Sequence, residues 1–237
     1  MTQSRAIAND AWAFSGKNAR GRFFDEMAVF YDLAMLPLEA LLLRSLRGRL
    51  FRRLHGMVLE VGVGTGVNFA YYPPDACLIG MDESWDMLHV AALRARACFH
   101  LTQSDVQRLP FADDAFDCIV GTLLFCSVPD PLRGLRELRR VLKPDGRLIL
   151  LEHVRGLTPV ARQATDFLNP FWTRFTRSCH LNRETVQTVA AAGFTVTHSE
   201  RHGLTIFQII EASKHIGRLG QNRPGVPENT FDEDAAL

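Results

Sequence analysis

Three glycines at alternate positions after an apolar run constrain the fold of this chain more than any other feature. The run reads Val58-Leu59-Glu60-Val61-Gly62-Val63-Gly64-Thr65-Gly66. Its apolar half predicts a strand, and its glycines predict a turn that opens a helix. Glycine adopts positive φ and lets a ligand approach the backbone, while the start of a helix offers free N–H groups. The pattern predicts an α/β fold that holds a nucleotide-like ligand.

The spacing of the glycines narrows the kind of ligand. A dinucleotide-binding turn needs its third glycine one position later, where this chain has Val67. Glu60 stands just ahead of the first glycine, where its charge would repel a pyrophosphate and attract a cation. We therefore expect a positively charged cofactor.

These residues resemble the first motif of the class I S-adenosylmethionine-dependent methyltransferases of the small-molecule type, an acidic residue followed by G-x-G-x-G. The similarity extends in order and spacing over residues 56–155. It includes Ile79-Gly80-Met81-Asp82, Ser104-Asp105-Val106, Leu109-Pro110-Phe111, Phe116-Asp117-Cys118-Ile119-Val120 and Leu142-Lys143-Pro144-Asp145-Gly146-Arg147-Leu148. Two departures are Val63 in place of the commoner Cys and Asp145 in place of the commoner Gly.

The resemblance implies a Rossmann-like doubly wound sheet of seven strands, mostly parallel with an antiparallel last strand. It also implies S-adenosyl-L-methionine as cofactor and S-adenosyl-L-homocysteine as product. The residues expected to bind the cofactor are Tyr31, Glu60, Gly62, Gly64, Gly66, Asn68, Asp82, Glu83, Asp105, Val106 and Thr122.

Several of these residues have a second interpretation. Glu60 either faces the ammonium group of the cofactor or organises the glycine loop, or it is merely a surface acid. Asp82 suits the ribose hydroxyls, but an Asp after a strand also caps a helix, here one beginning near Ser84. Asp105 accepts the adenine amino group in the resembling family, or is simply a turn residue.

Two further residues lie near the methionine end of the expected cofactor site. Tyr31 reaches the cofactor from the N-terminal cap in the resembling family, or packs in the core with its hydroxyl satisfied. Asn68 contacts the cofactor carboxylate, or is a polar residue of the first helical turn.

Methyl transfer requires little acid–base catalysis from the protein, because a sulfonium already makes the methyl group electrophilic. Alignment of the acceptor, the methyl group and the sulfur supplies much of the catalysis. A thiol acceptor, with a pKa near about 8.5, needs little activation, whereas an alcohol or phenol needs a base. His153 ends the predicted fifth strand and is the best candidate for such a base, with Tyr31 as a second catalytic candidate. The expected substrate pocket comprises Cys126, Ser127, His153, Trp172, Cys179 and His180.

The sequence leaves the chemical identity of the methyl acceptor open. Tyr71-Tyr72-Pro73-Pro74, Cys126-Ser127-Val128, Glu152-His153-Val154 and Cys179-His180-Leu181-Asn182-Arg183 look similar to the alkyl-thiol methyltransferases and to phospholipid N-methyltransferases. That resemblance implies a small lipophilic thiol or a lipid amine. Quinone C-methylation is a third alternative, aminopropyl transfer a fourth, and cofactor binding without turnover a fifth.

Composition limits the class of partner and location. The chain has 237 residues, 47% of them hydrophobic, and a net charge of +1, which gives no electrostatic case for nucleic acid. Five cysteines without a C-x-x-C pair predict free thiols and no metal site. Because no secretory signal or apolar run of roughly 18 residues is evident, we expect a cytoplasmic protein.

We expect a flexible N-terminus (1–19), a single methyltransferase domain (20–219) and a disordered tail (220–237). The expected parts of the domain are a helical cap (20–55), a cofactor-binding core (56–155), a substrate-lid insertion (156–185) and a C-terminal helix and strand pair (186–219). Strands are expected near 56–61, 76–81, 97–102, 116–121, 146–153, 194–201 and 204–211, and helices near 66–72, 84–95, 130–142, 158–176 and 183–192.

The segment 41–54 interleaves five arginines with leucine and phenylalanine. Such a helix either packs its apolar face on the core or lies on an anionic membrane surface. Peripheral membrane contact through 41–54 would favour the lipid-amine acceptor. The sequence does not determine the oligomeric state.

Overall fold

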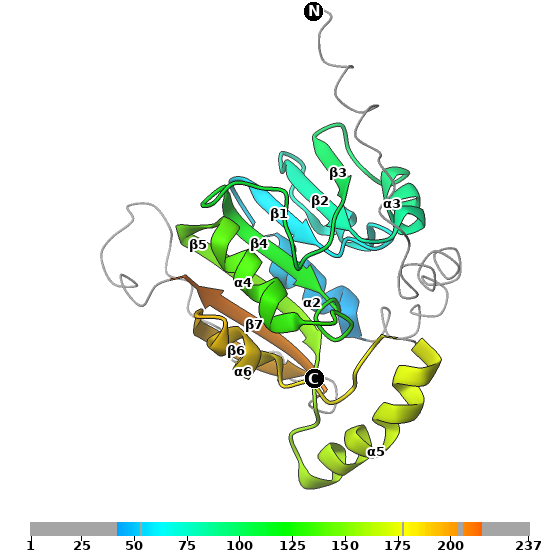
Figure 1. Ribbon diagram of the computed structural model, residues 1–237. Helices are drawn as coiled ribbons and strands as arrows, with labels where there is room; N and C mark the ends of the chain where they lie inside the picture. The colour runs from blue at the N-terminus through cyan, green and yellow to red at the C-terminus, as the bar shows by residue number, and fades with distance from the viewer. Residues whose placement is uncertain (1–41, 53, 177, 203–205, 215–237) are drawn as a thin grey trace, which may run out of the picture.

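The computed structural model describes residues 42–52, 54–176, 178–202 and 206–214 (Figure 1). The expectations for 1–19, for the cap up to residue 41, for Tyr31 and for the tail 220–237 therefore lie outside the described residues.

Within these residues, seven strands form one sheet in the order β3-β2-β1-β4-β5-β7-β6. They are β1 (Val58–Val61), β2 (Leu78–Asp82), β3 (Phe99–Gln103), β4 (Phe116–Thr122), β5 (Leu142–His153), β6 (Thr195–His202) and β7 (Phe207–Ser213). β1 to β5 pair in parallel, and β7 runs antiparallel to both β5 and β6. The predicted α/β sheet, mostly parallel with a reversed last strand, is confirmed.

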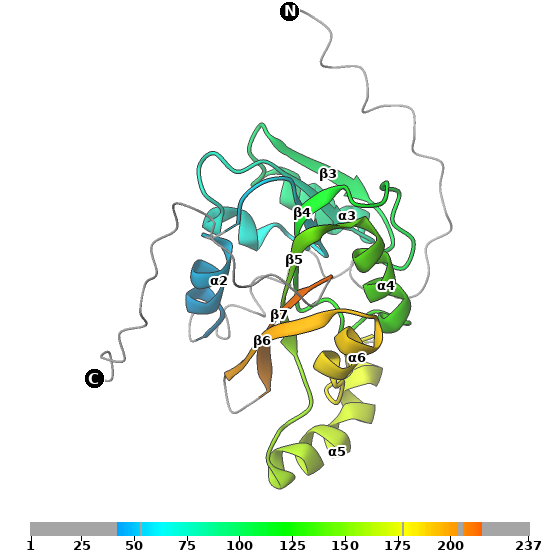
Figure 2. The same ribbon diagram turned by 90° about the vertical axis from the view of Figure 1, so that its left-hand side faces the viewer.

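Helices cover both faces of the sheet, as the edge-on view in Figure 2 shows for α2 on one side and α4 and α6 on the other. The helices are α2 (Arg44–Phe51), the 3₁₀ helix η2 (Val67–Tyr71), α3 (Trp85–Ala92), α4 (Pro131–Val141), α5 (Pro159–Thr176) and α6 (Thr185–Ala191). α5 stands apart from the sheet at one end of the molecule (Figures 1 and 2).

The alternation of side chains along the strands divides the core into two clusters. Leu59 and Val61 of β1 pack with α4 and α6, whereas Val58 packs with α2, η2 and α3. Because side chains two apart share a face, Glu60 lies on the same side as Val58. The carboxylate ahead of the glycine loop is therefore directed towards α2 and η2.

Two elements differ from the sequence prediction. The helix after the glycine loop is a five-residue 3₁₀ helix, preceded by Gly66 at φ 79° and followed by the extended Tyr72. The fifth strand begins at Leu142 rather than near 146, because Leu142 already pairs with Phe116 before the register shifts and continues at Cys118 and Arg147.

Gly66 tests how tightly the glycine loop is packed. A Cβ there would lie 2.8 Å from Cε2 of Phe69 and 3.1 Å from Cα of Ala91, at a φ of +79°. We expect Gly66→Ala to lower the free energy of unfolding in urea by about 2–3 kcal/mol through strain and overpacking. Gly48→Ala is the control, because its Cβ would meet its nearest neighbour at 4.0 Å and replacing a helical glycine stabilises by about 0.5–1 kcal/mol. Equal stability of the two variants would contradict this packing.

Candidate active site

A cleft of about 100 Å³ opens at the carboxyl ends of β1, β2, β3 and β4. It lies where the strand order reverses between β1 and β4, the usual ligand position in doubly wound sheets. The residues that line it are Gly62, Gly64, Met81, Asp82, Glu83, Ser84, Met87, Ser104, Asp105, Val106, Thr122, Leu123, Leu124, Ser127 and Val128.

The glycine loop forms one wall of this cleft. Its glycines have φ values of 69° at Gly62, 54° at Gly64 and 79° at Gly66. Gly62 and Val63 donate their N–H groups to the Met81 carbonyl at 2.8 and 3.0 Å, which ties the loop to β2. A Cβ on Gly64 would meet nothing within 4 Å. Gly64 therefore leaves open space beside the backbone, as a closely held ligand requires.

Asp82 joins the glycine loop to the start of α3. Its Oδ2 accepts the Gly64 N–H at 2.8 Å and its Oδ1 accepts the Ser84 N–H at 2.9 Å. Ser84 itself caps α3 by accepting the Met87 N–H at 3.2 Å. Since each carboxylate oxygen accepts more than one hydrogen bond, Asp82 keeps acceptor capacity at the cleft surface.

Asp105 is also held by its own turn. Its Oδ1 accepts the backbone N–H of Gln107 at 2.9 Å, and both carboxylate oxygens accept the Gln107 side-chain amide, at 3.1 and 3.0 Å. Asp105 therefore makes the contacts expected of a turn residue. Asp105 and Val106 also line the cleft.

Glu60 is fully buried, at 0% exposure, rather than open to the cleft. It accepts hydrogen bonds from Asn68 Nδ2 at 2.6 Å and from the Tyr72 hydroxyl at 2.9 Å. Burial raises the pKa of Glu60 to about 7 against the lowering effect of these bonds. Its contacts are those of a residue that organises the glycine loop, because they tie β1 to both ends of η2.

Arg47 of α2 extends this buried network and was missed from the sequence. It donates to Asn68 Oδ1 and, at 3.1 Å, to the Thr122 hydroxyl, and Asn68 donates to the same hydroxyl at 3.0 Å. Asn68, Gly66 and Glu60 stand behind the cleft wall rather than on it, whereas Thr122 is part of both. In the sequence, Arg47 is one of five arginines of 41–54, and nothing in that pattern distinguishes it from an arginine exposed to solvent.

Glu152 of β5 holds the opposite wall and was also missed. The side chain is fully buried and accepts the N–H groups of Leu124 at 3.1 Å, Phe125 at 3.0 Å and Cys126 at 3.3 Å. Burial raises its pKa to about 7. Leu123, at the start of this loop, has a φ of 54°, a strained conformation that neighbouring contacts must maintain. The sequence did contain a signal for this role, because Glu152 directly follows the apolar run Leu148-Ile149-Leu150-Leu151.

The segment after α5 packs against the same loop. The His180 N–H donates to the Cys126 carbonyl at 2.9 Å, and the Cys126 thiol is hydrogen-bonded to Cys179. This bond raises the pKa of Cys126 and lowers that of Cys179. Arg183 donates to the Val128 carbonyl at 2.7 Å. The predicted pocket residues Cys126, Cys179 and His180 are thus brought together, directly behind Ser127.

The other two predicted pocket residues, His153 and Trp172, do not line the cleft, although the Trp172 side chain is hydrogen-bonded to Cys179. His153 packs edge-on against Phe207 with ring centroids 5.7 Å apart, and its Nδ1 has no hydrogen-bond partner in the described part of the chain. Burial lowers the pKa of His153 to about 4. Trp172 is 42% exposed on α5. Of the six predicted pocket residues, only Ser127 lines the cleft.

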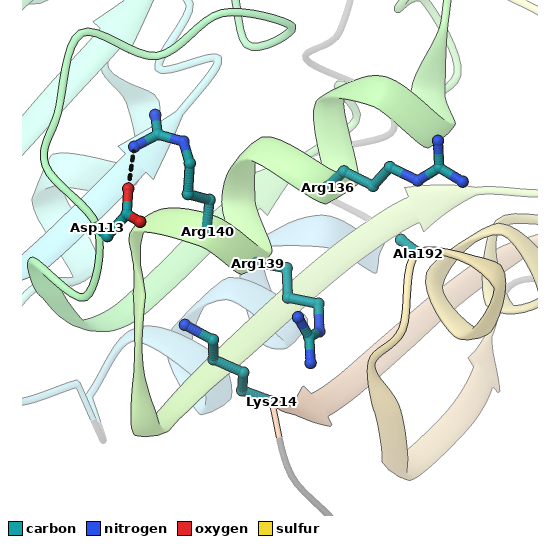
Figure 3. A pocket seen from close by; sticks show the side chains of 6 residues that line it. All are labelled: Asp113, Arg136, Arg139, Arg140, Ala192 and Lys214. Carbon is teal, nitrogen blue, oxygen red and sulfur yellow. Dashed lines mark hydrogen bonds and ion pairs between the residues drawn. The ribbon is translucent and has the colours of Figure 1, made fainter.

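A second, larger hollow of about 460 Å³ lies at the opposite edge of the sheet (Figure 3). It is lined by Asp113, Arg136, Arg139, Arg140, Ala192 and Lys214. Arg140 is already bonded to Asp113 at 2.8 Å and to Glu137 at 2.9 Å, and Lys214 to the Leu142 carbonyl at 2.9 Å. With no glycine turn, this hollow does not suit a nucleoside, so the smaller cleft is the candidate active site.

The strand order, the reversed β7 and a glycine-lined cleft with carboxylates after β2 and β3 define the seven-stranded class of S-adenosylmethionine-dependent methyltransferases. A family model described as a methyltransferase domain matches residues 59–150. The chain belongs to the S-adenosylmethionine-dependent methyltransferase family, and S-adenosylmethionine is its cofactor.

Thiol S-methyltransferase TMT1B of Rattus norvegicus is 34% identical over 154 residues, which span 60% of this chain and only 62% of that protein. The Homo sapiens TMT1B is 31% identical over 191 residues, 72% of this chain and 77% of that protein. Phosphatidylethanolamine N-methyltransferase of Cereibacter sphaeroides is 35% identical over 112 residues, 45% of this chain and 55% of that protein.

A solved S-adenosylmethionine-dependent methyltransferase of Thermotoga maritima has the same fold, with a TM-score of 0.65 at 23% identity, covering 82% of this chain and 99% of its own. In the described ranges, no helix is long and apolar enough to cross a membrane. No group of three His, Cys, Asp or Glu side chains suited to a metal ion occurs there either.

Substitutions at Gly64 and at Gly66 should have different effects on cofactor binding and on stability. We expect Gly64→Ala to cost about 1–2 kcal/mol of stability, from the positive φ alone, because its methyl group enters open space. The same methyl group should weaken S-adenosylmethionine binding about tenfold or more, since it occupies the cleft wall. Isothermal titration and urea unfolding of the same preparation measure both quantities. Unchanged affinity would show that the cofactor does not approach Gly64.

Glu60 predicts a pH dependence of stability. Its folded pKa of about 7 lies above the ordinary 4.5, so the fold favours the protonated acid; this contribution is full below pH 4.5 and is lost as pH rises to 7. We expect the stability of the wild type relative to Glu60→Gln to fall by roughly 2–3 kcal/mol between pH 4.5 and 7.5. Urea unfolding of both proteins across that range measures the difference. A constant difference would mean that Glu60 ionises normally.

Proposed function

We propose that this protein transfers the methyl group of S-adenosylmethionine to the sulfur of a small, lipophilic thiol. The observation that carries the proposal is the composition of the cleft beyond the glycine loop. Leu123, Leu124 and Val128 make that end apolar, and Ser127 contributes a hydroxyl. Among the described lining residues, no His, Lys or Cys faces an acceptor there. Such a site suits an acceptor that supplies its own nucleophile.

The proposed cofactor contacts follow from the positions of the lining residues. Asp82, with Glu83 beside it, would accept the ribose hydroxyls, and Asp105 with Val106 would hold the adenine. Gly62, Gly64 and Thr122 would border the methionine end. Glu60, Gly66 and Asn68 would act through the shape of the loop. Tyr31 would contribute from the N-terminal cap.

The reaction needs alignment more than acid–base chemistry. When bound, the sulfonium supplies an electrophilic methyl group. The thiolate sulfur of the acceptor would form a bond to the methyl carbon as the bond between that carbon and the cofactor sulfur breaks, and the electron pair of the broken bond would stay on the cofactor sulfur. The thiol proton is lost to solvent beforehand. The loop held by Glu152 fixes Leu124 and Ser127 for this in-line approach and excludes water.

A phospholipid amine is the second candidate acceptor. The relative from Cereibacter sphaeroides favours it, but an ammonium group must lose a proton before attack, and His153, with a pKa of about 4, is a weak base. Quinone-type C-methylation and cofactor binding without turnover are further alternatives. The cofactor residues Asp82 and Asp105 are intact, which argues against the last.

We propose a cytoplasmic location, which the five free thiols of the chain support. The apolar face of α2 packs in the core through Leu46, Leu50 and Phe51. A membrane contact of 41–54 would therefore depend on its exposed arginines alone.

An acceptor screen tests the proposed function. Purified protein is titrated with S-adenosylmethionine and S-adenosylhomocysteine, then assayed for methyl transfer to alkyl thiols, phosphatidylethanolamine and a quinol. We expect binding that is lost in Asp82→Ala and turnover of the thiols only. Preferred turnover of the amine or the quinol would overturn the thiol assignment, and absence of all turnover with intact binding would favour a non-catalytic role.

The pH dependence of turnover identifies the source of the nucleophile. With no enzyme base required, we expect kcat/KM to rise tenfold per pH unit up to the pKa of the thiol used, near about 8.5, and then to level off. Thiols of lower pKa should shift the profile by the difference in their pKa values. His153→Gln should change kcat/KM less than about threefold. A loss of about a hundredfold in that variant would make His153 the general base.

A further inference from the structure

α5 presents its polar side to the protein and its apolar side to solvent. Asn169 Oδ1 accepts the Leu181 N–H at 2.8 Å, and the Thr173 hydroxyl donates to the Cys179 carbonyl at 3.1 Å. Asp166 pairs with Arg155, with Nε of the arginine 3.0 Å from Oδ1. Together with the buried Thr165, these residues recur every three or four positions and form the inward face of the helix.

The opposite face of α5 is apolar and exposed. Phe167 is 72% exposed, Phe171 67% and Phe175 74%, at a spacing of four residues that places them in one row. Val160 and Leu168 lie beside this row and are also exposed, and Trp172, 42% exposed with its side chain hydrogen-bonded to Cys179, lies at the border of the row. We call these six residues the aromatic face. An amphipathic helix ordinarily packs its apolar side on the core, so this orientation calls for an apolar occupant outside the described fold.

The charges around the aromatic face indicate what that occupant is. Arg174 is exposed on α5 beside the aromatic face, whereas Arg162 precedes Asp166 by four residues and lies on the side of the inward face. The acid of this helix, Asp166, is neutralised by Arg155 on the inward side. The outer surface of α5 therefore combines phenylalanine, tryptophan and arginine without an acidic side chain among its exposed residues, the combination found on helices that lie in the headgroup region of anionic bilayers.

The position of α5 leaves this surface accessible. The helix stands at one end of the molecule, away from the sheet and from α2 and α4 (Figures 1 and 2). It is nevertheless connected to the cleft, because Thr173 holds Cys179 and the adjacent His180 holds Cys126, next to Ser127.

We propose that α5 docks on an anionic lipid bilayer through the aromatic face, with Arg174 at the headgroups. The docked helix brings the acceptor end of the cleft to the membrane surface, where lipophilic molecules are concentrated. This surface is distinct from 41–54, and the docking does not depend on methyl transfer or on the identity of the acceptor.

Vesicle flotation tests the docking with the full chain. We expect the protein to float with vesicles of phosphatidylcholine and phosphatidylglycerol, and more weakly with phosphatidylcholine alone. Phe167→Ser/Phe171→Ser/Phe175→Ser should reduce the bound fraction about tenfold or more, and Arg174→Glu should reduce the preference for the anionic lipid. Leu93→Ser is the matched control, because Leu93 is 87% exposed and lies directly after the end of α3. Unaltered S-adenosylmethionine affinity shows that each variant is folded.

The fluorescence of Trp172 provides an independent readout. In a Trp12→Phe/Trp85→Phe background, emission should shift to the blue on anionic vesicles and be quenched by brominated acyl chains. Flotation equal to the wild type in the triple phenylalanine variant, or absence of quenching, would overturn the proposal.

Two other occupants give different results. A second copy of the chain would produce a concentration-dependent dimer in sedimentation, abolished by the triple variant, with no flotation. A segment of the chain itself would protect residues 159–176 from hydrogen exchange without lipid. Either result would overturn membrane docking, while thiol turnover in detergent tests the proposed function separately.

Discussion

Two buried carboxylates, Glu60 of β1 and Glu152 of β5, hold the two loops between which the cleft forms. Each is fully buried, and burial raises each pKa to about 7. A carboxyl group in such a position is costly unless hydrogen bonds satisfy it. Glu60 obtains them from Asn68 and Tyr72, and Glu152 from three consecutive backbone N–H groups. Leu123, at a φ of 54°, directly precedes the N–H groups that Glu152 holds, whereas the N–H of Gly64 is held by Asp82.

The side of the cleft that the glycine loop, Asp82 and Asp105 form could be predicted from the sequence because its signals are local. In a parallel sheet, the carboxyl ends of strands meet at one edge, so Asp82 after β2 and Asp105 after β3 had to approach the glycine loop. The network behind that wall could not be predicted in the same way. Arg47 reaches Thr122 across 75 positions and Glu152 reaches Leu124 across 28, and no local pattern reports such pairs.

The acceptor side shows the same limit more strongly. His153 ends an apolar strand at the correct edge, yet the antiparallel register of β7 places Phe207 directly opposite it. That neighbour buries the imidazole and lowers its pKa, which the order of residues could not reveal. Cys126 and Cys179 are brought together by the return of the chain after α5. The sequence indicated which residue types were present there, but not which of them face the cleft.

The expected helix at 158–176 gave no indication of which face of α5 would be exposed. A repeat of apolar residues defines the axis of amphipathicity, but its direction depends on what each face contacts. Here Asn169 and Thr173 find backbone partners in the segment 179–181, and Asp166 finds Arg155, so the polar side is held inward. The same bonds that turn the aromatic face outward also fix Cys179 against the wall of the cleft. Any contact made by that face therefore acts on a helix already joined to the acceptor site.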